Sequence, residues 1–164
     1  MEIQITQLSS ADLSCAGDLA HILIAAWRSG FRGILPDAVI GQYTQFAPCA
    51  DMFRQVLASG EGNLYLAQQK GQPVGLLYWV PEENCARIEA LLTIPDVWGQ
   101  GVAATLMAHT LKHTSAYPVV TVWPFVRNHR ARRFYEKHGF SPSGRSRMGD
   151  AEEMEYCYHH KGKV

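Results

Sequence analysis

The sequence predicts an α+β protein with a mixed, mostly antiparallel central sheet flanked by helices. Before residue 60, apolar residues recur every three or four positions, which is typical of amphipathic helices. From residue 63 to residue 94 they mostly alternate with polar residues or form short apolar runs, which is typical of strands. The short turns at residues 70–72 and 81–84 predict an antiparallel meander.

The N-terminal part predicts one strand and three helices. Residues 1–8 alternate as a strand does, and Ser9 with Asp12 forms a capping-box pattern that opens a helix. The apolar face of that helix consists of Leu13, Ala16, Ala20, Leu23 and Trp27. Pro36 suits the first turn of a second helix, and residues 50–58 form a third.

The remainder predicts strands and helices in alternation. Strands are expected at residues 63–69, 73–80, 85–94, 118–123, from 140 onward and at 153–159, and helices at about 100–113 and 128–138. No linker, repeat or low-complexity tract interrupts this pattern. We therefore expect a single domain over residues 1–164.

Composition excludes several functional classes. The 164 residues are 47% hydrophobic and 18% charged, with 15 basic and 15 acidic side chains, so neither nucleic acid nor a membrane surface is an expected partner. The longest apolar run, residues 22–27, is too short for a membrane span, and the N-terminus lacks a signal-peptide pattern. Four cysteines without a C-x-x-C pair predict buried thiols, so we expect a cytoplasmic protein.

The zero net charge conceals an uneven distribution. Residues 1–96 contain 5 basic and 10 acidic residues, a net −5, and residues 148–164 contain 2 and 4, a net −2. Residues 97–147 contain 8 basic residues and one acid, a net +7. This distribution indicates either chance clustering on solvated faces or a local anion site in a neutral protein.

A glycine loop in the basic segment is the strongest candidate for that anion site. A strand ends near Pro95, Gly99 and Gly101 follow, and a helix begins, which directs backbone N–H groups toward one point. A Walker A loop is excluded because no Gly-Lys-Ser/Thr is present. Gly99, Gly101 and Ala104 satisfy the Rossmann fingerprint, but no acidic residue lies between Asp96 and Glu136 to hold a ribose.

Two segments together carry a family resemblance. From Pro95 the loop reads P-x-x-W-G-Q-G-V-A, and from Asn128 the chain reads N-x-x-A-x-x-F-Y-x-x-x-G-F. In this order, with one helix and one strand between them, they resemble the GNAT superfamily of acetyl-CoA-dependent N-acetyltransferases over about residues 85–140. The family's loop motif is Q/R-x-x-G-x-G/A, and Trp98 replaces its first residue here.

The resemblance implies acetyl-CoA as co-substrate, with no metal. The residues it implies for cofactor binding are Leu92, Thr93, Gly99, Gln100, Gly101, Val102, Ala103, Ala104, Asn128 and Arg133. One or two of the arginines at 127, 130, 132 and 133 are expected to contact phosphate, the others being solvated. Because Trp98 lacks the family's polar side chain, we expect more of the phosphate binding to fall to backbone amides and nearby arginines.

Two residues are candidates for proton transfer. The resemblance implies that Tyr135 lies beside the cofactor sulfur as general acid, although it could simply pack its helix onto the sheet. Glu89 lies among apolar neighbours and four residues before Thr93, so alternation places the two on one face. It is either a partly buried general base, directly or through water, or an edge residue paired with Arg87.

The acceptor amine is less well defined by sequence. Candidates for its pocket are Trp27, Phe31, Arg32 and Tyr43, and the net −5 of residues 1–96 favours a small cationic amine. The alternatives are acetylation of a protein N-terminus or lysine, and a non-catalytic acyl-CoA-binding sensor. His109 and His113 have metal-ligand spacing but no third ligand, so no metal is expected, and a homodimer stays open.

Overall fold

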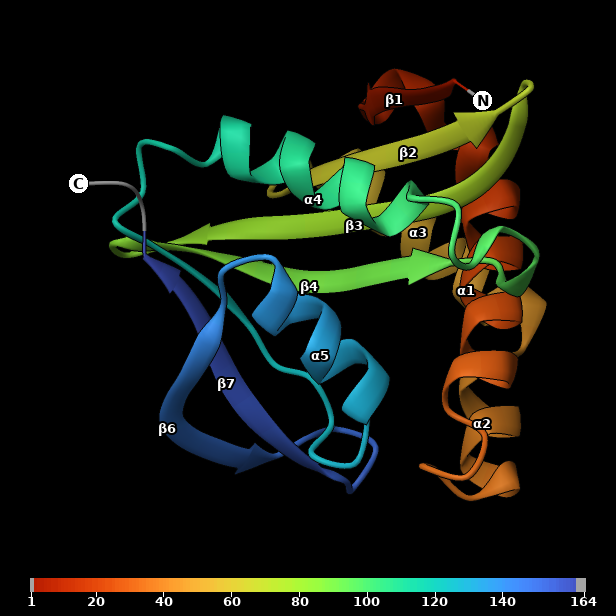
Figure 1. Ribbon diagram of the computed structural model, residues 1–164. Coiled ribbons are helices and arrows are strands. Elements are labelled where there is room, and N and C mark those ends of the chain that lie inside the picture. The colour runs from red at the N-terminus through yellow and green to blue at the C-terminus, as the bar shows by residue number, and fades with distance from the viewer. Residues whose placement is uncertain (1, 162–164) are drawn as a thin grey trace.

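Seven strands form one sheet in the order β1-β2-β3-β4-β5-β7-β6 in the computed structural model, which describes residues 2–161 (Figure 1). The strands are β1 (Ile3–Leu8), β2 (Asn63–Gln69), β3 (Gln72–Glu82), β4 (Cys85–Thr93), β5 (Val119–Val122), β6 (Ser141–Met148) and β7 (Met154–Lys161). Every pair of neighbours is antiparallel except β4 and β5, which are parallel. The predicted mixed, mostly antiparallel sheet is confirmed, and residue 1 of the first predicted strand lies outside the described residues.

The helices agree with the predicted ones in number and differ at their ends. They are α1 (Ala16–Gly30), α2 (Asp37–Tyr43), α3 (Phe46–Ser59), α4 (Val102–His113) and α5 (His129–Lys137), with short 3₁₀ helices η1 (Ser10–Cys15) and η2 (Pro95–Val97). None of the helices within residues 2–161 combines the length and the apolar character that crossing a membrane requires.

The predicted capping box forms, but the helix it opens is a 3₁₀ helix. The Asp12 carboxylate accepts a hydrogen bond from the Ser9 N–H at 2.8 Å, and the Ser9 hydroxyl accepts one from the Ala11 N–H at 3.2 Å. Backbone angles at Asp12 are non-helical, so α1 begins only at Ala16. The expectation of one continuous helix from Ser9 is therefore wrong.

The third helix begins at Phe46, four residues before the expected start. Pro48 lies in its first turn, where a backbone N–H would have no acceptor within the helix. A proline therefore costs the helix little stability at this position. The expected start at residue 50 did not take this tolerance into account.

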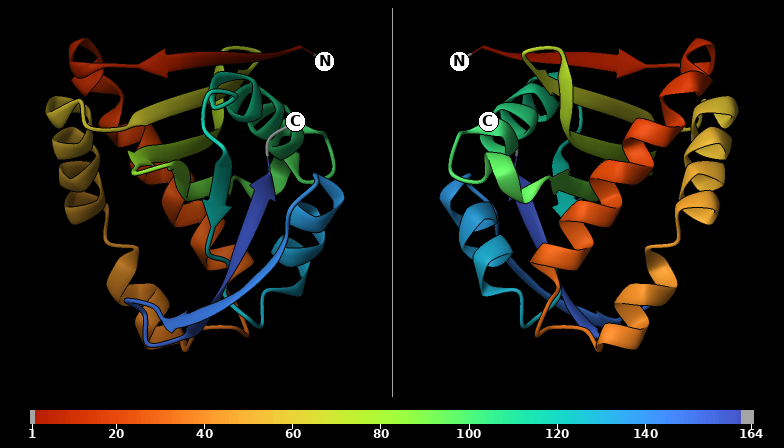
Figure 2. Two further views of the ribbon diagram at one scale, coloured as in Figure 1. Left: turned by 90° about the vertical axis from the view of Figure 1, so that its left-hand side faces the viewer. Right: turned by 90° about the vertical axis from the view of Figure 1, so that its right-hand side faces the viewer.

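Helices cover both faces of the sheet (Figures 1 and 2). α1 and α3 lie on one face, where they bury Leu64, Leu66 and Leu76. α4 and α5 lie on the other, with Tyr65 and Leu77 in the core beneath them. This division follows from the two-residue alternation of β2 and β3, because successive side chains point to opposite faces.

β4 is irregular at Glu89. Ile88 pairs with Trp79 and Ala90 pairs with Tyr78, so Glu89 has no partner on β3. Ile88 belongs to the core beneath α4 and α5, whereas Ala90 packs against the core beneath α1 and α3. The alternation that would place Glu89 and Thr93 on one face therefore does not run unbroken through this bulge.

Candidate active site

The sheet divides where β4 and β5 stop pairing. Within residues 2–161, the parallel ladder ends at Ile88 and Val122, and β4 continues to Thr93 without a strand on that side. In Figure 1 the C-terminal half of β4 runs away from β5 and β7, with α4 on one side and α5 on the other. Residues 89–93, which include the predicted Leu92 and Thr93, thus present an unpaired backbone edge that can bind an extended ligand by strand-like hydrogen bonds.

The glycine loop lies at the far end of this edge. Gly99 and Gly101 have φ of +80° and +86°, a left-handed conformation that favours glycine. A Cβ atom at either position would find open space, so the residues around them leave room for a ligand close to the backbone. α4 begins at Val102 and not at residue 100, because the left-handed Gly101 is its N-cap.

The start of α4 leaves hydrogen-bond donors free. Among the described residues no side chain caps this helix, and the first three N–H groups, those of Val102, Ala103 and Ala104, have no acceptor within it. With the helix dipole, these groups fit a phosphate. The side chain of Gln100 instead donates to the Asp96 carbonyl at 3.2 Å within the loop.

Asn128 caps the other motif helix. Its side-chain oxygen accepts a hydrogen bond from the Ala131 N–H at 3.1 Å, as the side chain of an N-cap asparagine does. This bond fixes the start of α5.

The four arginines of this segment do not form one cluster. Arg127 pairs with Glu153 through N–O contacts of 2.8 and 3.0 Å and also donates to the Ile34 carbonyl. Arg132 donates to the Tyr158 hydroxyl at 2.9 Å and to a backbone carbonyl at 2.8 Å. These two arginines therefore hold the fold together, whereas Arg133 is exposed on α5.

Arg130 contacts the glycine loop. Its guanidinium lies 3.5 Å from the centre of the Trp98 ring, and partial burial lowers the pKa of Arg130. The Trp98 indole N–H donates to the Thr93 carbonyl at 3.4 Å. Sequence reasoning assigned no individual role to Arg130; the departure from the family motif at Trp98 was the one signal that pointed to this contact.

Tyr135 lies in the core beneath α4 and α5 with only 7% of its surface exposed. Its ring packs 5.7 Å from that of Phe140, and Ile88 and Val122 belong to the same cluster. Burial raises the pKa of its hydroxyl well above the usual range, so the side chain stays protonated at neutral pH. The structure thus shows the packing role and a phenol that keeps its proton.

Of the two alternatives for Glu89, the structure shows the exposed residue paired with Arg87 and not the partly buried one. Its side chain is 38% exposed and pairs with Arg87, which also pairs with Glu82. The physical reason is the bulge, which releases Glu89 from the ladder and lets it reach a cation on the same strand.

Three of the four predicted acceptor residues come together. The Trp27 ring centroid lies 4.9 Å from that of Phe31 and 5.3 Å from that of Tyr43, and Phe31 packs 5.0 Å from Phe125. Phe125 follows Val122 by three residues, so this aromatic cluster borders the segment where β5 leaves β4. Arg32 is exposed and instead lines a separate cavity of about 430 Å³.

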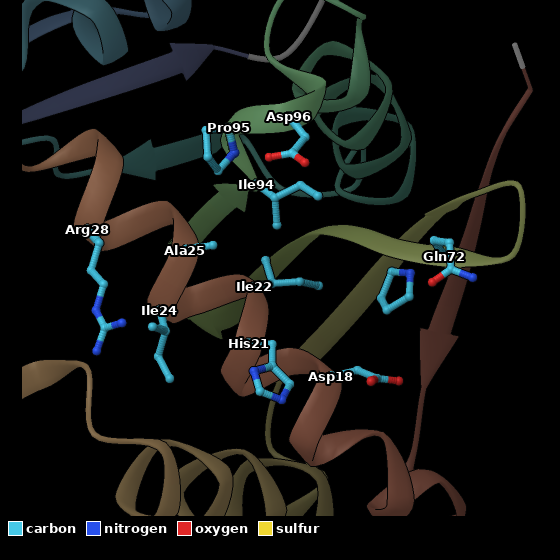
Figure 3. Close-up of a pocket in the computed structure, with 11 residues that line it drawn as sticks. Asp18, His21, Ile22, Ile24, Ala25, Arg28, Gln72, Ile94, Pro95 and Asp96 are labelled. Carbon is cyan, nitrogen blue, oxygen red and sulfur yellow. The ribbon is translucent and has the colours of Figure 1, made fainter.

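A second cavity, of about 520 Å³, lies against the solvent-exposed face of α1 (Figure 3). Its polar lining consists of Asp18, His21, Arg28, Gln72 and Asp96. It shares the Ile94–Asp96 segment with the glycine loop, yet it includes none of the predicted acceptor residues. The acceptor region indicated by the aromatic cluster is thus separate from this cavity.

The chain matches the family model described as the acetyltransferase (GNAT) family over residues 22–140. It is 26% identical over 124 residues to a probable N-acetyltransferase of Mycobacterium tuberculosis, covering 73% of this chain and 71% of that protein. It is 35% identical over 101 residues to the peptidyl-lysine N-acetyltransferase YjaB of Escherichia coli, covering 61% of this chain and 63% of that protein.

Solved structures share the fold. The PaiA N-acetyltransferase of Thermoplasma acidophilum, solved in complex with coenzyme A, superposes with a TM-score of 0.81 at 17% identity, covering 98% of this chain and 99% of that one. The ribosomal-protein-S18-alanine N-acetyltransferase of Escherichia coli superposes with a TM-score of 0.72 at 16% identity, covering 99% of this chain and 96% of that one.

The match to the family model shows that the chain belongs to the GNAT family and is an acetyl-CoA-dependent N-acetyltransferase.

Proposed function

We propose that this protein transfers an acetyl group from acetyl-CoA directly to a primary amine at the opening between β4 and β5. The observation that carries the proposal is the unpaired edge of residues 89–93 leading into a glycine loop with open space above it. When bound, acetyl-CoA supplies the activated acetyl thioester. The backbone at Leu92 and Thr93 binds the extended arm of the cofactor and polarises the acetyl carbonyl.

The phosphates of the cofactor bind at the start of α4. The backbone N–H groups of Val102, Ala103 and Ala104 donate to them, because the first turn of the helix has no other acceptors for these groups, and Gly99 and Gly101 leave open space for the approach. Asn128 and the exposed Arg133 contact the cofactor from the α5 side.

Tyr135 donates the proton that the departing sulfur requires. Burial raises the pKa of the phenol, so its proton is present at every pH near neutral. Glu89 accepts the proton of the amine through water, because its exposure leaves room for an intervening solvent molecule. Its pairing with Arg87 holds the carboxylate at the bulge beside the opening.

The acceptor is a small cationic amine. The net −5 of residues 1–96 supports a cation, and the cluster of Trp27, Phe31 and Tyr43 offers aromatic faces to which an ammonium group is attracted. A peptide lysine is the second candidate, favoured by the similarity to the peptidyl-lysine N-acetyltransferase YjaB.

The test is a panel of acceptors assayed for released coenzyme A with DTNB, on the wild-type protein and on Tyr135→Phe. We expect turnover with small polyamines or aminated metabolites to exceed turnover with lysine peptides. In Tyr135→Phe, kcat falls about 100-fold while the Kd for coenzyme A is unchanged, because the phenyl ring keeps the packing and loses only the proton.

Other outcomes separate the alternatives. Preference for lysine peptides identifies a protein acetyltransferase. Saturable coenzyme A binding without turnover on any amine identifies a binding module. If Tyr135→Phe turns over every acceptor at the wild-type rate, Tyr135 is not the acid.

A further inference from the structure

Arg130 and Trp98 connect the two walls of the proposed cofactor site. Trp98 immediately precedes the glycine loop and α4, and Arg130 lies in the first turn of α5. These two helices flank the unpaired edge of β4 in Figure 1. The guanidinium of Arg130 lies 3.5 Å from the centre of the Trp98 ring, so a side chain of α5 contacts the residue that leads into the glycine loop and α4.

We propose that Arg130 binds the diphosphate of the cofactor and that Trp98 positions its guanidinium for this contact. The assignment rests on the cofactor site proposed above. In this assignment Trp98 stands where the family motif has a polar side chain, and Arg130 of α5 supplies the charge that contacts the phosphates.

The stacking geometry leaves the donors of Arg130 available. A guanidinium carries its five N–H groups in one plane, so contact through its face keeps all of them free to reach phosphate oxygens. The ion pairs formed among residues 2–161 involve Arg54, Arg87, Arg127 and Arg147 and not Arg130. In contrast, the donors of Arg127 and Arg132 are used within the fold.

The Trp98 ring is itself held in place. Its indole N–H donates to the Thr93 carbonyl, and its backbone N–H donates to the Pro95 carbonyl at 3.1 Å. Thr93 ends β4 and Pro95 begins η2, so the ring is fixed to the segment that leads into the glycine loop. The Trp98 ring therefore has a fixed position relative to the loop whose N–H groups are proposed to bind the same phosphates.

Calorimetric titration with coenzyme A tests the proposal without an acceptor. Arg130→Gln should weaken binding about 10- to 100-fold, because a charge-assisted hydrogen bond to phosphate is lost. Lys137→Gln removes one positive charge from the exposed end of the same helix and should bind as the wild type does. Dephospho-coenzyme A lacks the ribose phosphate and keeps the diphosphate, so Arg130→Gln should weaken its binding by the same factor.

Trp98 is tested by rescue and by coupling. Trp98→Leu should weaken coenzyme A binding, Trp98→Phe should restore most of the loss because an aromatic face remains, and Trp98→Leu should add little in the Arg130→Gln background. Independent, additive losses would overturn the positioning role.

The remaining outcomes are equally decisive. A loss seen with coenzyme A but not with dephospho-coenzyme A assigns Arg130 to the ribose phosphate and overturns the diphosphate contact. Equal binding by wild type and Arg130→Gln overturns the proposal while the cofactor site stands. Absence of binding by the wild type would instead reject the cofactor site itself.

Discussion

Individual titratable residues differ in whether the fold exposes or buries them. Burial keeps the Tyr135 proton on the phenol, whereas the bulge at Glu89 turns a carboxylate with apolar sequence neighbours out toward Arg87. His109 shows the same effect away from the site. Its ring packs 4.5 Å from that of Tyr65 and 4.2 Å from that of His113, and burial, then the charges of His113 and Lys112, lowers its pKa.

We expect His109 to make the protein less stable in mild acid. Its folded-state pKa is lowered, so its contribution to stability is present above the unfolded pKa of about 6.5 and is lost as the pH falls through the lower folded value. Thermal unfolding at about pH 8 and about pH 5.5 measures the loss, and His109→Gln should reduce the difference. An unchanged difference would show that other groups, such as His138, control the acid limb.

At the level of secondary-structure elements, Gly75 sets the distance between β3, β4 and α4. A Cβ atom there would lie 3.1 Å from the Leu92 carbonyl oxygen, the Thr93 methyl and a Val102 methyl. All three atoms belong to the segment that leads into the glycine loop or to the helix after it. The absence of a side chain on β3 is therefore what lets the start of α4 approach the sheet.

Gly75→Ala should lower the free energy of unfolding by about 1–3 kcal/mol, because backbone and two side chains must shift to accept the methyl group. It should also weaken coenzyme A binding, since the start of α4 is displaced. Urea unfolding and calorimetry measure the two effects.

Gly41→Ala is the matched control. Gly41 lies inside α2, and a Cβ atom there meets nothing within 4 Å. Alanine should stabilise the protein by about 0.5–1 kcal/mol and leave coenzyme A binding unchanged. If both variants behaved alike, the close approach at Gly75 would not control the position of α4.

At the level of the whole molecule, Arg127 joins segments far apart in sequence. It pairs with Glu153 and donates to the Ile34 carbonyl, and so links the connection between α1 and α2 to the start of α5 and the start of β7. The pairing lowers the pKa of Glu153. Phe31 and Phe125 of the aromatic cluster lie on these connections.

Arg127→Gln should loosen the α1–α2 connection. Hydrogen exchange followed by mass spectrometry should show backbone amides of residues 31–35 exchanging about two to five times faster, with α4 unchanged. Arg54→Gln, which removes an exposed ion pair with Asp51 within α3, is the control and should leave the exchange of residues 31–35 unchanged. Unchanged exchange in Arg127→Gln would mean that aromatic packing alone holds this connection.

The sequence by itself determined the α+β class, the order of the elements and the two motifs of the family, because these depend on local spacing. Alternation along β2 and β3, the capping oxygens of Ser9 and Asn128 and the glycines of the loop act over a few residues. The predicted ends of helices were wrong where one residue departs from the usual preference of its type, as Pro48 does inside the first turn of α3 and left-handed Gly101 does as the N-cap of α4.

Only the tertiary structure decided the opening between β4 and β5, the exposure of Glu89 and the contact of Arg130 with Trp98. Each depends on which strands pair and where that pairing stops. β4 pairs with β3 across a short turn and with β5 only after the intervening α4, and the end of one ladder at Ile88 and the bulge in the other depend on those partners. The local pattern of one chain segment does not show where pairing with another segment stops. For the same reason, the four arginines at 127, 130, 132 and 133 could be assigned different roles only from their partners in the folded structure.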